Sequence, residues 1–419
     1  MPDSENSKNI QTFLRFTILQ SIGTGIWMGS VFSLFIVIMA EQSGSLFGLR
    51  PNEVLGATSA VSGIVMLLLV LPAGFLADRW SREGTIRIAI GSGIIGVLFL
   101  MLGQSIYSII IGLVFYGGFN ALSGPAAEAL LADSVASGNR SGIYTRIHAT
   151  RQFGMTFGPL LSIFLFLWLG NTWELSILRR VMTAGLGFAM VSIFLLAGLK
   201  ERHTLGDESE SVHHAPGAER HQAARKGQRF VPMTILLANF IVGMGAGMTV
   251  KFFPVFFRDI YNLSPVQVQL ILTLTFAVSA GLGILAQRIS KKRGRAQMIV
   301  LVQALAIGCL ASIAFYPAVI WLVPLFALRN ALMNASQPLS RSIIMDFVPK
   351  KNRGTWNALQ SVAWGIFWSA SAVLGGFLIG DGNFRQCFLI TAGVYAIGTL
   401  PILFIIPFVE QERSRDHQR

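Results

Sequence analysis

The stretch Gly74-Phe75-Leu76-Ala77-Asp78-Arg79-Trp80-Ser81-Arg82, termed here the signature turn, decides the fold of this chain. It follows one long apolar run, which ends near Ala77, and precedes another that starts near Ile86. Two runs of bilayer length joined by so short a turn predict a tight hairpin of two membrane-spanning helices. The glycine permits close backbone approach, and the aspartate stands where a membrane helix meets water.

The composition predicts a helical protein that crosses the membrane many times. Of the 419 residues, 53% are hydrophobic and 13% are charged, whereas a soluble protein carries about 25% charged residues. Apolar runs of about 20 residues or more recur along almost the whole chain, as polytopic helical proteins require. The expected spans are residues 12–40, 52–77, 85–104, 106–133, 141–169, 173–199, 230–257, 265–289, 295–315, 318–346, 352–379 and 383–409.

The distribution of basic residues predicts the orientation of the spans. The formal net charge is +13, and the bases gather at alternate inter-helix loops. They include Arg79, Arg82, Arg87, Arg140, Arg146, residues 200–229, residues 288–295, Lys350, Lys351 and Arg353. This alternation is typical of cytoplasmic loops and predicts that both termini are cytoplasmic. It argues against nucleic-acid binding, because the chain has no basic soluble domain that could bind DNA or RNA.

Two similar halves flank a polar segment. We expect an N-terminal six-helix bundle at residues 1–200, a flexible cytoplasmic linker at 201–229, a C-terminal six-helix bundle at 230–410 and a cytoplasmic tail at 411–419. The linker holds four histidines that could bind metal, but a solvated linker explains them as well.

A repeated pattern supports the duplication. Ser123, Pro125, Asp133 and Arg140 match Ser336, Pro338, Asp346 and Arg353 at one constant offset. Internal repeats of this kind are typical of secondary transporters, whose substrate site lies near the bilayer midplane between the repeats.

The signature turn resembles the loop between the second and third helices of the major facilitator superfamily, G-x-L-A-D-R-x-G-R-K. Ser81 replaces the second glycine and Glu83 the final base, and a weaker copy at residues 283–288 carries Gln287 in place of the aspartate. The resemblance covers nearly the whole chain apart from the linker and tails. It implies an all-α integral membrane fold of twelve helices in two pseudo-symmetric six-helix bundles, and transport by alternating access.

The resemblance also implies a charge relay that gates the cytoplasmic side. Asp78 would latch that side in the outward-facing state, with loop arginines as partners. The relay residues are Asp78, Arg79, Arg82, Asp133, Arg140, Asp346 and Arg353. The alternative is a set of simple interfacial ion pairs, each worth about 0–1 kcal/mol.

Charged residues inside the apolar runs are expected to be functional. Glu128 and Arg341 occupy equivalent positions in the two halves and could pair across the inner vestibule. Glu128 is the first candidate proton carrier, because burial favours the neutral form of a carboxyl group. His148 is a second candidate, although a helix-packing role explains it as well.

Two deep cations, Arg151 and Lys251, predict contact with an anionic substrate group. The alternatives are an ion pair between Arg151 and Glu128, and a Lys251 side chain that snorkels outward. Other residues that could bind substrate are Arg341, Tyr116, Asn120, Asn334, Gln337, Gln360 and Trp364.

Two further motifs are partial. Residues 154–159 resemble an antiporter pattern, G-x-x-x-G-P-x-x-G-G, which favours export, but a packing kink is the alternative. Met244 and Met248 share a helix face, as in some copper importers, yet the next expected span lacks the His-x-x-x-Met that would accompany them. We therefore expect no metal and no cofactor. There is also no nucleotide-binding loop, so ATP does not drive the protein directly.

These observations predict a secondary transporter, not an enzyme. It would move a small organic solute, anionic or amphipathic, with proton coupling and in the direction of export. An uptake symporter for a small nutrient is the alternative within this class, and a non-transporting membrane receptor or scaffold is the alternative outside it. We expect a functional monomer in a bacterial cytoplasmic membrane, with the substrate, protons and lipid bilayer as its partners.

Overall fold

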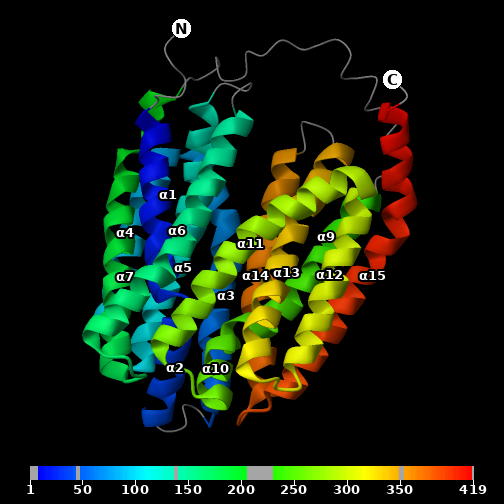
Figure 1. Cartoon of the computed structure of the whole chain (residues 1–419). Helices are drawn as coiled ribbons and strands as arrows, with labels where there is room; N and C mark the ends of the chain where they lie inside the picture. The colour runs from blue at the N-terminus through cyan, green and yellow to red at the C-terminus, as the bar shows by residue number, and fades with distance from the viewer. Residues whose placement is uncertain (1–7, 44–47, 136–139, 205–229, 349–352, 418–419) are drawn as a thin grey trace. The chain divides into compact units, whose positions relative to one another are not determined.

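The computed structural model describes residues 8–43, 48–135, 140–204, 230–348 and 353–417, and these ranges contain helices and turns but no strands (Figure 1). By its internal contacts the chain divides into two compact units. Unit 1 comprises Met1–His213 and Lys251–Thr273, and unit 2 comprises His214–Val250 and Leu274–Arg419.

Unit 1 holds the helices of the first half of the sequence and a short part of the second. Its helices are α1 (Lys8–Trp27), α2 (Ser30–Ser43), α3 (Pro51–Arg79), α4 (Arg82–Leu102), α5 (Ile106–Asp133), α6 (Arg140–Leu169), α7 (Leu175–Leu195), η2 (Leu196–Gly198), η3 (Glu201–His203) and α10 (Phe253–Tyr261). The first turns of α11 (Pro265–Arg293) also belong to this unit.

Unit 2 holds the remaining helices of the second half. They are α9 (Phe230–Thr249), the rest of α11, α12 (Arg295–Ile313), α13 (Val319–Phe347), α14 (Arg353–Ile379) and α15 (Phe384–His417). A short 3₁₀ segment, η6 (Val250–Phe252), interrupts the helical run between α9 and α10.

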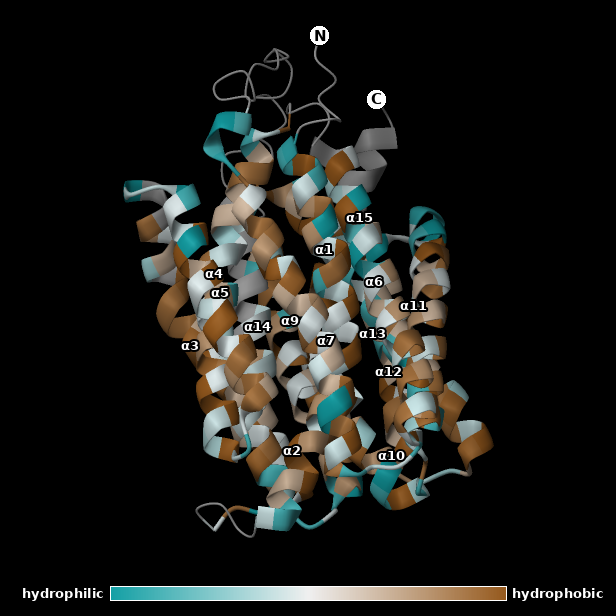
Figure 2. Cartoon of the chain, turned by 90° about the vertical axis from the view of Figure 1, so that its left-hand side faces the viewer, coloured by the Kyte–Doolittle hydropathy of each residue, from teal (hydrophilic) through white to brown (hydrophobic). Residues whose placement is uncertain are grey.

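Eleven of the twelve expected membrane spans are confirmed among the described residues. Within the described ranges, eleven helical segments are long and apolar enough to cross a membrane, and the first of them, Lys8–Ser43, includes both α1 and α2. The twelfth expected span, residues 352–379, corresponds to α14, whose described apolar part is Phe367–Ile379. Figure 2 shows hydrophobic colours along most of the helix lengths. The fold is therefore the expected all-α integral membrane architecture.

Small residues let α1 pack closely against α6 and α7 in unit 1. A Cβ atom on Gly158 would lie 2.5 Å from the Cα of Gly25, so only glycine fits at this crossing. A Cβ on Gly154 would similarly lie 2.6 Å from the Cβ of Ser21. In a bilayer such close contact is a main source of helix association. The glycines of the antiporter-like motif thus have a packing role, and they hold α6 beside α1.

Unit 2 is built around α9, which packs against α14 and α15. A Cβ on Gly375 would lie 2.9 Å from the Cα of Met248, so α14 also approaches α9 at backbone distance. The apolar core of this unit includes the fully buried residues Val231, Ile235, Ile299, Ile343, Ile344 and Ile402.

Candidate functional site

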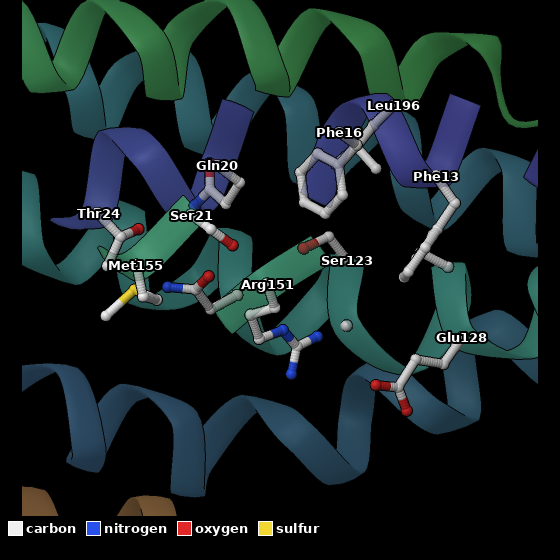
Figure 3. Close-up of a pocket in the computed structure, with 13 residues that line it drawn as sticks. Phe13, Phe16, Gln20, Ser21, Thr24, Ser123, Glu128, Arg151, Met155 and Leu196 are labelled. Carbon is white, nitrogen blue, oxygen red and sulfur yellow. The ribbon is translucent and has the colours of Figure 1, made fainter. Parts of the chain in front are cut away.

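A cavity of about 260 Å³ lies between α1, α5 and α6 of unit 1 (Figure 3). The close crossing of α1 and α6 sets one of its walls, and η2 contributes a residue at one end. Its lining consists of Phe13, Phe16, Gln20, Ser21, Thr24, Asn120, Ser123, Gly124, Ala127, Glu128, Arg151, Met155 and Leu196.

Two charged side chains of opposite sign reach this cavity. Glu128 comes from α5 and Arg151 from α6, and both are exposed. Figure 3 shows the Arg151 guanidinium and the Glu128 carboxylate on the side of the view opposite the Phe13 and Phe16 rings. Neither forms an ion pair with any residue that the structure describes. The alternative of a direct Glu128–Arg151 pair is therefore not seen, and both charges are available to a ligand or to water.

A hydrogen-bonded chain fixes the polar wall of the cavity. Gln20 donates through Nε2 to the Tyr116 hydroxyl at 2.7 Å, and the Ser192 hydroxyl donates to Gln20 Oε1 at 2.5 Å. Tyr116 is 2% exposed and does not line the cavity, because it lies behind Gln20 and packs edge-on against Trp27. Tyr116 thus does not reach the cavity lining directly, whereas Asn120 lies on the lining itself, and substrate contact by either residue stays a prediction.

The other wall of the cavity is apolar. The Phe13 and Phe16 rings lie 5.9 Å apart on α1, and Leu196 of η2 lines the same cavity. A hydrocarbon group can bury surface against this wall while a charged group reaches Arg151. The arrangement suits a ligand with both an apolar and an anionic part.

The signature turn connects α3 and α4 at one end of unit 1. Asp78 lies in the last turn of α3, but its side chain is outside the part that the structure describes. The Arg79 guanidinium lies 4.4 Å from the Phe75 ring centroid, and Arg82 forms an ion pair with Asp133 at the end of α5. Two members of the expected relay are therefore in contact.

A model of the Major Facilitator Superfamily matches residues 17–329 and, in a second match, residues 235–419. The chain belongs to the Major Facilitator Superfamily. It is accordingly a multi-pass membrane transporter of a solute, not an enzyme.

Solved structures agree on the fold of this superfamily. A bacterial homolog of the human lysosomal transporter Spinster, in an inward-facing and occupied conformation, has a TM-score of 0.73 at 13% identity, covering 96% of both chains. A mutant of the nucleoside transporter NupG has a TM-score of 0.71 at 11% identity, covering 95% of this chain and 99% of that one. A D-xylose-proton symporter has a TM-score of 0.67 at 17% identity, covering 96% and 97%.

One curated relative matches a smaller part. A probable triacylglyceride transporter from Mycobacterium leprae (strain TN) is 29% identical over 139 residues, which is 32% of this chain. The match spans about a quarter, 26%, of that relative's length.

Of the other residues in the expected charge relay, the structure describes only some side chains. In unit 2, Asp346 pairs with Arg295 at 2.5 Å, a partner that the sequence analysis did not name. Arg140 and Arg353 are the first residues of α6 and α14, and their side chains lie outside the described part. Their place in the relay stays a prediction.

The other candidate residues lie away from the cavity lining. His148 is exposed on α6, and Lys251 is half-buried in η6, where the helical run is interrupted. Arg341, Asn334 and Gln337 lie on α13, and Gln360 and Trp364 on α14, all in unit 2. The proposed pairing of Arg341 with Glu128 stays a prediction.

The sequence analysis missed one buried cation. Arg329 on α13 is 2% exposed, and its Nη2 donates to the Tyr395 hydroxyl at 2.5 Å and to the Thr249 hydroxyl at 3.4 Å. Its Nη1 donates to the side chain of Asn330 at 2.9 Å. The signal that identified Arg151, a charge inside an apolar run, was equally present for Arg329.

The start of the expected linker is ordered against unit 1. Residues Glu201–His203 form η3, and Glu201 contacts the first turn of α4. Desolvation and the nearby charges of Arg202, Lys8 and Lys200 lower the pKa of His203. The part of the linker at 205–229 lies outside the described residues.

Proposed function

We propose that this protein moves a small amphipathic anion across the membrane by alternating access, with proton coupling and in the direction of export. The observation that carries the proposal is the cavity of unit 1, where an exposed arginine that forms no ion pair with the described residues lies across from an apolar wall. Such a site can bind the charged group of a ligand and bury the hydrocarbon part of the same ligand.

Arg151 is the proposed contact for the anionic group. A guanidinium binds carboxylate, sulfonate or phosphate oxygens through parallel hydrogen bonds. Asn120 and Ser123 line the same cavity and can add neutral hydrogen bonds. Phe13, Phe16 and Leu196 would cover the hydrocarbon part. The similarity to a probable triacylglyceride transporter supports a cargo with a hydrocarbon part.

Glu128 is the proposed proton carrier. It is the only carboxylate among the described residues that line this cavity, so its charge would act on any anion bound there. A proton on Glu128 would remove its repulsion of an anion near Arg151, so this linkage alone makes the proton and the anion bind together, as in the uptake alternative. Export would instead require that the two exchange, and the antiporter-like pattern at residues 154–159 is what favours it.

The pattern of charged residues in the sequence supports proposals for the gating of the transporter and for its membrane location. We propose that Asp78, Arg79, Arg82, Asp133, Arg140, Asp346 and Arg353 control closure of the cytoplasmic side. The bundles at 1–200 and 230–410 would move relative to each other in a functional monomer. The alternating basic loops support a cytoplasmic membrane location with both termini inside.

Transport in proteoliposomes tests this proposal. The probe is N-decanoyl taurine, whose sulfonate stays charged and does not cross the bilayer unaided, and decanoylcholine is the cationic control of equal chain length. We expect counterflow of the taurine conjugate, driven accumulation under a pH gradient, and little flux of the choline ester. A cation preference would contradict the anion assignment, and an absence of flux for both probes would contradict the proposed substrate class.

The Glu128→Gln variant tests the coupling. We expect it to lose gradient-driven accumulation while it keeps counterflow, because exchange needs no net proton movement. If gradient-driven transport survives in this variant, the proton assignment is wrong. The direction of the gradient that drives movement separates export from the uptake alternative.

A further inference from the structure

The first turn of α4 directly follows the signature turn, and the N–H groups of its first three residues have side-chain partners. A helix begins with N–H groups that lack partners inside the helix. The Ser81 hydroxyl accepts from the N–H of Gly84 at 2.8 Å. The N–H of Arg82 donates to Oε1 of Glu201 at 2.9 Å, and that of Glu83 donates to the same oxygen at 3.4 Å. Glu201, which lies 119 positions after Arg82 in the sequence, thus caps α4.

The electrostatics of this contact favour a carboxylate. The N-terminus of a helix carries a partial positive charge, and a side-chain anion placed there is stabilised. The Arg82 guanidinium pairs with Asp133 of α5 at the same place. The backbone and the side chain of Arg82 are therefore held by two different carboxylates. Together with Trp80, Ser81, Leu130 and Thr204, these groups enclose a polar pocket of about 280 Å³.

Glu201 is itself held in position by α1. Asn9, which is fully buried, donates through Nδ2 to the Lys200 carbonyl at 2.9 Å and accepts from the Lys200 N–H at 3.1 Å. The same Nδ2 also donates to the Ser134 hydroxyl beside the end of α5 at 2.9 Å. The turn that carries Glu201 is therefore fixed by two helices before it meets α4.

We propose that Glu201 is a positioning residue that ties the signature turn to the start of the segment joining the two halves of the sequence. Through this contact, the first turn of α4 and residues 200–204 move as one body. A displacement of residues 200–204 then reaches the first turn of α4 through the hydrogen bonds that Glu201 Oε1 accepts from the N–H groups of Arg82 and Glu83. This role goes beyond the proposed choice of substrate and does not depend on it.

Amide hydrogen exchange of the full-length protein in nanodiscs tests the proposal without a substrate. Loss of a capping side chain costs about 1 kcal/mol, so Glu201→Ala should make the amides of Arg82 and Glu83 exchange about fivefold faster. Glu201→Gln keeps an oxygen acceptor but loses the charge, so a smaller increase is expected. The matched control is Glu174→Ala at the start of α7, where the carboxylate makes no capping bond and the first amides of α7 should be unaffected.

A second variant tests the positioning role. Asn9→Ala leaves Glu201 intact but releases Lys200, so it should also speed exchange at Arg82 and Glu83. Unchanged exchange at these two amides in Glu201→Ala would overturn the proposal. An equal increase at the first amides of α7 in Glu174→Ala would also overturn it, because the effect would then be a general one of losing a carboxylate. If Asn9→Ala leaves Arg82 and Glu83 unaffected, Glu201 is a local cap and not a positioning residue.

Discussion

Arg151 and Arg329 are both arginines inside apolar helices, yet their surroundings differ completely. Arg151 on α6 is exposed, lines the cavity of unit 1 and has no ion pair among the described residues. Arg329 on α13 is 2% exposed in unit 2 and donates to Tyr395, Thr249 and Asn330. A charge in an apolar helix is costly in either case, but only its surroundings show whether it serves a ligand or the fold.

The location of Arg329 explains how unit 2 tolerates a buried cation. Thr249 is the last residue of α9, so the guanidinium lies at a helix C-terminus, where the helix dipole favours positive charge. The guanidinium also lies 5.5 Å from the centroid of the Tyr395 ring, which adds a cation–π contact. Arg329 therefore ties α9, α13 and α15 together.

The largest expected effect is on the stability of the folded protein, where the two arginines should differ most. Arg329→Ala should destabilise the folded protein by about 2–5 kcal/mol, because it removes several buried hydrogen bonds and leaves a cavity. Arg151→Ala should change stability by no more than about 0.5 kcal/mol, since its side chain faces open space. Unfolding of both purified variants in mixed micelles measures the difference. Equal losses of stability would break the distinction between the two residues.

The second expected effect concerns ligand binding, for which Arg151 should matter more than Arg329. Arg151→Gln should weaken binding of N-decanoyl taurine by about 10- to 150-fold, which corresponds to about 1.5–3 kcal/mol for hydrogen bonds to a charged group. Isothermal titration measures the affinity, and unchanged stability of the variant serves as the control. Binding equal to that of the wild type would show that the anion does not contact Arg151.

The smallest expected effect sharpens the account of Arg329. Tyr395→Phe removes one hydroxyl acceptor but keeps the ring, so the guanidinium retains its cation–π contact and its bonds to Thr249 and Asn330. We expect a loss of about 0.5–1.5 kcal/mol in the free energy of unfolding. A loss as large as that of Arg329→Ala would mean that the tyrosine hydroxyl alone carries the network.

Much of the fold could be predicted because its signals are local in the sequence. Runs of bilayer length gave the spans, and the signature turn gave the family. The site was harder, because its residues come together only through packing. Asn120, Glu128 and Arg151 were chosen by residue type, and the structure brings these three to one cavity. Gln20 was missed, because a single amide in an apolar run shows no pattern until α1 packs against α5 and α6.

The limits of sequence reasoning are clearest at Glu201 and Arg295. Glu201 lies in a polar stretch that has the composition of a linker, so nothing local distinguishes it from its neighbours. Its contact with α4 spans 119 positions and depends on Asn9 at the start of the chain. Arg295 likewise reaches Asp346 only because α12 packs against α13.

The most direct test of the central claim, that the cavity of unit 1 binds the transported anion, is chemical rescue at Arg151. The variant Arg151→Cys, made with the buried Cys309 and Cys387 replaced by serine, should lose counterflow of N-decanoyl taurine. Modification with 2-aminoethyl methanethiosulfonate places a cation at the same position and should restore part of the flux, whereas a neutral methyl reagent should not. Full transport by the unmodified variant, or equal effects of the two reagents, would contradict the account.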